Sequence, residues 1–140
     1  MLSQLKDAHD EMRATIAELA DVLSSPERDL QALAKTRMKL TRTSGKWRTL
    51  VQCEILPQLN DVPPEQARQI AELRREAAEF AVRKSNHIAR WSTRATEADI
   101  AGYLRASAEM RRQLLTRIDR EAALFYPLLE AKAACTAALP

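Results

Sequence analysis

The sequence has few of the residues from which disulfide-rich or metal-clustered domains are built. Its 140 residues contain two cysteines, Cys53 and Cys135, which make neither a disulfide framework nor a zinc pattern. Only two glycines are present, and aromatic residues make up 4% of the chain. With 46% hydrophobic and 29% charged residues, this is a helical composition whose core must be mainly aliphatic.

Long apolar runs and catalytic motifs are also lacking. No run approaches the roughly 18 residues of a membrane span, and charges in MLSQLKDAHDEM fall where a signal peptide has its apolar core. The net charge of +3 is too small an excess to favour nucleic acid as a partner. There is no Ser-His-Asp order and no glycine-rich phosphate loop. We therefore expect a cytoplasmic protein that is not an enzyme and has no membrane partner.

Hydrophobic residues recur at spacings of three and four, which predicts helices. Four are expected, at about residues 3–23 and 26–56, from 64 to at least 94, and from the 96–99 segment to 129 or beyond. Their short connections favour an all-α, antiparallel up-down-up-down four-helix bundle. The length predicts a single domain, residues 1–140.

Local signals place the helix boundaries. Ser25 is suited to cap the second helix, with Pro26 as its first residue. The segment from Thr96 to Asp99 resembles a capping box with Asp in place of Glu, and we expect the fourth helix to start there. Gly45 interrupts the second helix at a cost of about 1 kcal/mol relative to Ala. It either lets a neighbouring backbone approach or permits a small kink.

Polar side chains fall on the apolar stripes in the middle of the helices. We predict that they form a buried polar centre of His9, Lys84, His87, Arg117 and Glu121. Charged groups are rarely buried unless they are paired. Arg117 and Glu121 are four residues apart and therefore share one helix face, which favours an ion pair between them.

Two segments of the chain are rough copies of each other, namely WRTLVQCEILPQL from residue 47 and RIDREAALFYPLL from residue 117. Each follows a helix that carries one His. This pattern resembles the hemerythrin-like (HHE) bundles, which carry a His on the first helix and His-x-x-x-Glu before Phe-Pro on the second. The third and fourth helices of that family repeat the scheme. The resemblance covers nearly the whole chain and implies a hemerythrin-like four-helix bundle.

The family binds two irons in its core, but this chain departs from the ligand pattern. His9, His87 and Glu121 match ligand positions, whereas Trp47 and Val51 stand where the second-helix ligands are expected. Trp and Val cannot ligate a metal. We therefore expect no metal and no cofactor. The alternative implied by the resemblance is iron held by the three matching residues.

Arg117 stands where the family has its fourth-helix His, and its fixed positive charge opposes a metal. We interpret the guanidinium as the replacement for the metal charge, paired with Glu121. His9 and His87 would complete the hydrogen bonding, and Trp47 would fill the vacated volume. The alternative is that the two His residues beside a carboxylate form a pH-sensitive or ligand-sensing site.

A basic stripe on the second helix is a candidate interaction face. It consists of Lys35, Lys39, Arg42 and Lys46. Such a stripe could bind an acidic partner or a phosphate-bearing molecule. The alternative is a solvated face beside the acidic first helix.

These patterns lead to a functional expectation. We predict a non-enzymatic interaction or regulatory protein with a protein partner, of which a second copy of the chain is one form. The alternative is an iron-, oxygen- or nitric-oxide-binding sensor with a depleted metal site.

Overall fold

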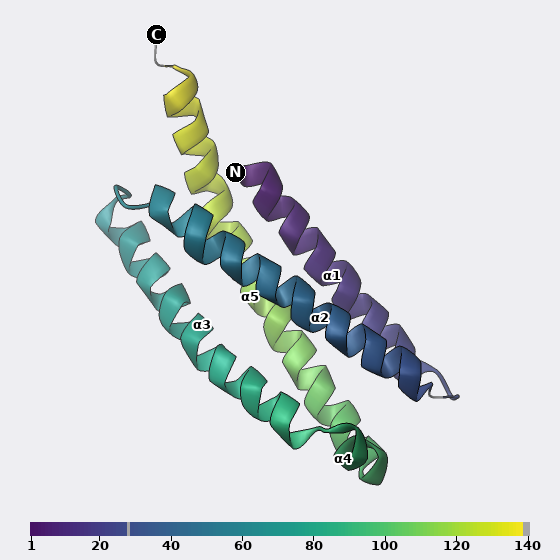
Figure 1. Cartoon of the computed structure of the whole chain (residues 1–140). Coiled ribbons are helices and arrows are strands. Elements are labelled where there is room, and N and C mark those ends of the chain that lie inside the picture. Colours follow the sequence, from purple (N-terminus) through teal and green to yellow (C-terminus); the bar gives the residue numbers. More distant parts are fainter. Residues whose placement is uncertain (28, 139–140) are drawn as a thin grey trace.

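The computed structural model describes residues 1–27 and 29–138, and nearly all of these residues are helical (Figure 1). Their helices are α1 (Leu2–Ser24), α2 (Leu30–Leu50), α3 (Pro64–Arg90), α4 (Thr93–Ala98) and α5 (Ile100–Ala137). A π-helical turn, Val51–Ile55, and a 3-10 turn, Leu56–Gln58, extend α2. No strand occurs in these ranges, so the predicted all-α class is confirmed.

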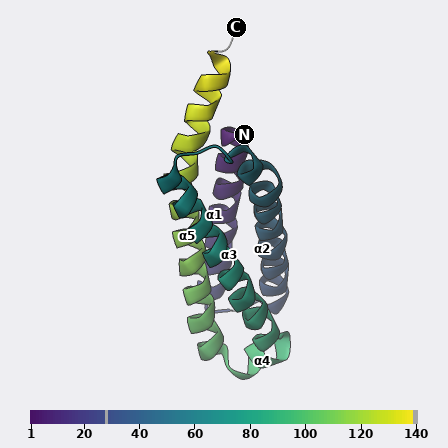
Figure 2. The same cartoon turned by 90° about the vertical axis from the view of Figure 1, so that its left-hand side faces the viewer.

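The long helices lie side by side in an elongated bundle, and α5 projects beyond one end of it (Figures 1 and 2). The N-terminus of α1 lies at that same end. α1 packs most extensively against α2 and next against α5, whereas α3 packs mainly against α5. None of the helices in the described ranges is both long and apolar enough to cross a membrane.

Two clusters of buried side chains form the core. The larger one includes Met12, Trp47, Phe80 and Phe125, and so joins α1, α2, α3 and α5. The smaller one lies toward the α4 end and centres on Trp91 and Tyr103. Burying each large side chain stabilises the fold by about 1.5–3 kcal/mol, so these few aromatic residues contribute strongly to a mainly aliphatic core.

The predicted start of the second helix is wrong. Asp29, not Ser25, caps α2, because its carboxylate accepts hydrogen bonds from the backbone N–H groups of Gln31 at 2.9 Å and Ala32 at 3.2 Å. Pro26 lies in a bend before the helix. Asp is as good a cap as Ser, and its position directly before Leu30 decides which one is used.

The predicted capping box at Thr96 is also wrong. Thr96 lies inside the short α4 and is 1% exposed. Ser92 caps α4, and Asp99 caps α5 by accepting from the N–H of Gly102 at 3.0 Å. The third helix therefore ends at Arg90 and does not reach residue 94 as predicted, and two caps, one on each side of α4, separate it from α5.

Prolines act differently in the two similar segments. Before Pro57, the N–H of Leu56 bonds to the carbonyl of Val51, five residues back, so α2 widens into a π turn. A proline ring clashes with the carbonyl four residues earlier, and a widened turn gives it room. Pro127 lies inside α5, which continues to Ala137. The prediction that the last helix extends to 129 or beyond is confirmed.

Candidate functional site

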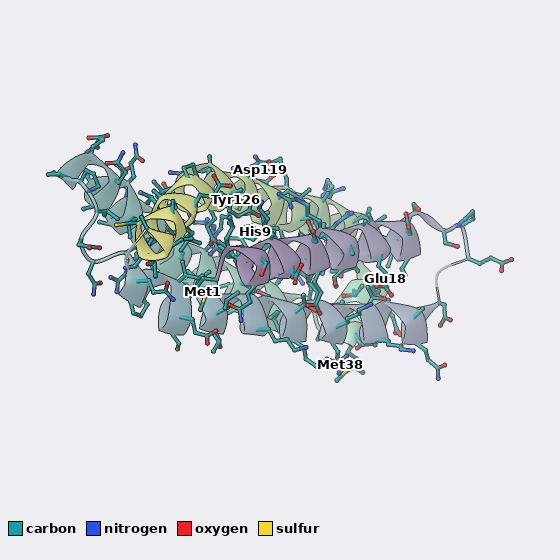
Figure 3. All side chains as sticks on the ribbon, turned by 90° about the horizontal axis from the view of Figure 1, so that it is seen from above. Met1, His9, Glu18, Met38, Asp119 and Tyr126 are labelled. Carbon is teal, nitrogen blue, oxygen red and sulfur yellow. The ribbon has the colours of Figure 1, made fainter. Side chains whose placement is uncertain are left out.

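A closed hydrogen-bonded centre surrounds His9, which is fully buried where α1 meets α5 (Figure 3). The Nε2 atom of His9 lies 3.0 Å from Oε1 of Glu121, and the Nδ1 atom lies 2.6 Å from the hydroxyl of Tyr126. A neutral imidazole with its proton on Nε2 satisfies both bonds, since it donates to the carboxylate and accepts from the tyrosine. We name this group, with Trp47, the His9 centre.

Trp47 of α2 completes the His9 centre. Its indole Nε1 donates to Oε1 of Glu121 at 2.9 Å, and its ring meets the His9 ring edge-on at 5.8 Å between centroids. One carboxylate oxygen therefore accepts two N–H groups from two other helices. Throughout the described ranges, no buried side-chain nitrogen or oxygen lacks a hydrogen-bond partner.

Arg117 does not form the predicted ion pair with Glu121. Its guanidinium lies between two aromatic rings, 4.9 Å from the centroid of Trp47 and 4.8 Å from that of Phe80. The expectation failed because the guanidinium is held over two ring faces, one of them that of Trp47, which was expected only to fill volume. Burial lowers the pKa of Arg117, and the nearby charge of Glu121 opposes that shift.

Lys84 reaches across from α3 to α2. Its Nζ atom donates to Oγ of Ser44 at 3.3 Å, and the side chain is half-buried. Burial lowers the pKa of Lys84, and the positive charges of Arg48 and Arg117 add to this effect. Lys84 therefore faces the same space as Arg117 but takes no part in the His9 centre.

His87 lies apart from His9. It is half-buried beside the smaller core cluster, stacked on Tyr103 with 6.1 Å between ring centroids. Burial lowers the pKa of His87, and the charge of Arg37 adds to the effect. The expectation that His87 completes hydrogen bonding around Glu121 is wrong. Trp47 donates the second hydrogen bond to Glu121, and Tyr126, which the sequence pattern did not single out, bonds to the other ring nitrogen of His9.

The side chains do not fit an iron centre of the family type. No three His, Cys, Asp or Glu side chains gather to hold an ion anywhere in residues 1–27 and 29–138. Of the three matching residues, only His9 and Glu121 come together, and each is already bonded to other protein groups. Val51, which the resemblance places where a second-helix ligand is expected, lines a cleft.

That cleft lies between α2 and α3, and we call it the α2/α3 cleft. It has a volume of about 850 Å³. Cationic side chains predominate among its charged residues, which are Arg48, Arg74, Lys84, Arg117 and Glu121. The cleft shares Ser44 and Lys84 with a second, more apolar hollow beside His87.

The basic stripe of α2 is fully on the surface. All four of its side chains, Lys35, Lys39, Arg42 and Lys46, are exposed. Lys39 pairs with Glu18 of α1 through a 2.8 Å contact, and Glu18 is labelled in Figure 3. This pair matches the solvated-face interpretation at one position and leaves the others available to a partner.

Comparisons of the chain with known protein families, with curated proteins and with solved structures found no match.

Proposed function

We propose that this chain is a non-enzymatic regulatory protein that acts by binding and needs no metal. In this proposal it is an antiparallel up-down-up-down bundle of hemerythrin-like design, in which the iron centre has been replaced by fixed hydrogen bonds. Its partner is a protein, reached through the exposed Lys35, Arg42 and Lys46, with a second copy of the chain as one form of that partner.

The observation that supports the proposal is the closure of the His9 centre. Both ring nitrogens of His9 and one oxygen of Glu121 are bonded to groups of the protein itself. Metal ligands need free lone pairs directed at a common point, together with one or more open positions for a catalytic or sensing role. Here Trp47 and Arg117 fill that space with an indole and a permanent cation.

Elemental analysis combined with native mass spectrometry tests the proposal. Protein purified without chelator is expected to contain far less than one iron per chain. Iron close to one per chain, with a charge-transfer absorbance that His9→Ala removes, would sink the proposal in favour of the iron-binding sensor. The same native mass reports whether the chain assembles with itself.

A further inference from the structure

The α2/α3 cleft carries positive charge that its own side chains do not neutralise. Four cationic residues line it, and the one acidic residue among them is Glu121. Oε1 of that carboxylate already accepts hydrogen bonds from His9 and Trp47. The cleft is therefore electropositive where Lys84 and Arg117 face it.

Lys84 and Arg117 are the two partly buried cations that line the cleft. Within the described ranges neither forms an ion pair with a carboxylate: Lys84 donates to a serine hydroxyl, and Arg117 contacts two aromatic rings while the charges of Glu121 and Glu76 act on it from nearby. Several arginines on the outer surface do form such ion pairs, as in Arg68–Glu65, Arg75–Glu79 and Arg112–Glu109. Burial and mutual repulsion lower the pKa of Lys84, which is the condition that an anion beside it relieves.

Apolar side chains form much of the remaining cleft wall, beside the polar Ser44, Thr49, Gln52 and Asn60. The apolar part includes Val51 of the π turn, Leu56 of the 3-10 turn, and Leu73, Ala77 and Phe80 of α3. From Leu73 to Lys84 the helix rises about 16 Å at roughly 1.5 Å per residue. The volume of about 850 Å³ lies within the roughly 300–1,000 Å³ of small-molecule sites, which combine apolar walls with a few polar groups.

We propose that the α2/α3 cleft binds an anionic amphiphile, a molecule with one carboxylate head and a hydrocarbon body. The head lies between Lys84 and Arg117, and the body follows the apolar wall toward Leu56 and Leu73. The inference rests on the proposed function in one respect, that the protein acts by binding. It names a small ligand where the proposed function names a protein partner.

Isothermal titration calorimetry with dodecanoate below its micelle concentration tests this. The wild-type protein is expected to bind one dodecanoate per chain. Dodecyltrimethylammonium, which has a similar body and the opposite charge, and acetate, which has only the head, are expected not to bind. Dodecanoate serves as the probe because its extended chain is comparable in length to the cleft.

Two lysine variants separate the local contact from general charge. Lys84→Met removes the proposed head-group contact, and dodecanoate binding is expected to weaken by about tenfold or more, since hydrogen bonds to charged groups are strong. Lys46→Met removes one positive charge from the exposed face of α2 outside the cleft, and it is expected to change affinity by less than about twofold. Arg117→Met, as a second cleft variant, is expected to act like Lys84→Met.

Circular dichroism and thermal unfolding establish that each variant is folded before it is titrated. Equal weakening by Lys84→Met and Lys46→Met, tight binding of the cationic amphiphile, or no binding of dodecanoate to the wild type would each overturn the inference. The iron analysis is independent of this titration. If the protein is metal-free and does not bind dodecanoate, the ligand inference is wrong and the proposed function stands. If the protein contains iron and binds dodecanoate, the proposed function is wrong and the ligand inference stands.

Discussion

At the scale of single residues, the carboxylate of Glu121 connects three helices through hydrogen bonds. It is 6% exposed and accepts N–H groups from His9 and Trp47. Glu121→Ala leaves both donors without an acceptor, and each buried neutral donor left unsatisfied costs about 1–3 kcal/mol, or about 2–6 kcal/mol for the two together. We expect the free energy of unfolding, measured in urea, to fall by roughly that amount.

Glu130→Ala is the matched control for this prediction. Glu130 lies on the same helix and is exposed, so its removal should change stability by less than about 0.5 kcal/mol. Two variants of equal stability would show that the His9 centre does not hold the bundle together.

His87 gives a prediction for pH. Its folded-state pKa is lowered below its ordinary value of 6.5 by burial and by Arg37. Between the lowered pKa and about 6.5 the unfolded chain therefore binds more protons, and stability rises with pH in that window. Conversely, stability falls as the pH drops from 7 through this range.

The variant His87→Gln should lose this contribution. Urea unfolding at pH 7.5 and at pH 5 is expected to show a smaller loss of stability for the variant than for the wild type. The carboxylates titrate in both proteins, so the difference between the two isolates His87. An equal loss in both would mean that the half-buried ring of His87 makes no such contribution.

Of the five polar residues that the sequence pattern placed in the core, two are buried and three are partly buried, and their pairing was not predicted correctly. His9 and Glu121 lie on apolar stripes, and both are buried. Tyr126 was missed because the spacing along one helix does not tell which ring nitrogen of another helix it will reach. The prediction put His87 beside His9 because a hydrophobic stripe indicates which face of its helix a residue lies on. The stripe does not indicate which residue of another helix packs against that face.

At the scale of helices and turns, the two glycines predict opposite effects of the same substitution. A methyl group at Gly45 would meet nothing within 4 Å, so neither a close backbone approach nor a crowded neighbour requires glycine there. Gly45→Ala is expected to raise the free energy of unfolding by up to about 1 kcal/mol, through the better helix propensity of Ala.

Gly102→Ala should act in the other direction. Its methyl group would stand 2.3 Å from Oδ2 of Asp99, the side chain that caps α5. Displacing this cap should lower stability by about 1 kcal/mol. In Asp99→Ala, where the cap is already gone, the glycine substitution should cost nothing more, and the better helix propensity of Ala should then act in its favour. Urea unfolding of the single and double variants measures this, and additive losses would contradict it.

The hydrophobic periodicity predicted that the long helices exist. It did not predict where they begin, because more than one nearby residue is suited to be the cap. Ser25 and Asp29 both suit the start of α2, and Asp29 is the one whose carboxylate meets the N–H groups of the first turn. The hydrophobic pattern does not indicate the π turn at Val51–Ile55, and the one sequence signal for it is the Pro57 that follows.

At the scale of the whole molecule, the helices differ in how many of their residues are buried. α1 has seven buried residues in 23, whereas the 27-residue α3 has two, Ile70 and Phe80. α3 also packs mainly against α5 and borders the α2/α3 cleft on its other side. Periodicity gave α3 an apolar stripe like the others and could not indicate that part of this stripe faces a cleft.

Local opening follows burial and contact density, so α3 should open before the rest of the bundle. Native-state hydrogen exchange is expected to give lower opening free energies for amides in the middle of α3 than for those in the middle of α1. Because a ligand that binds only the closed form adds stability, dodecanoate should slow exchange in α3 more than in α1. Uniform protection across both helices would mean that the bundle opens as one unit and that the cleft is not its weak side.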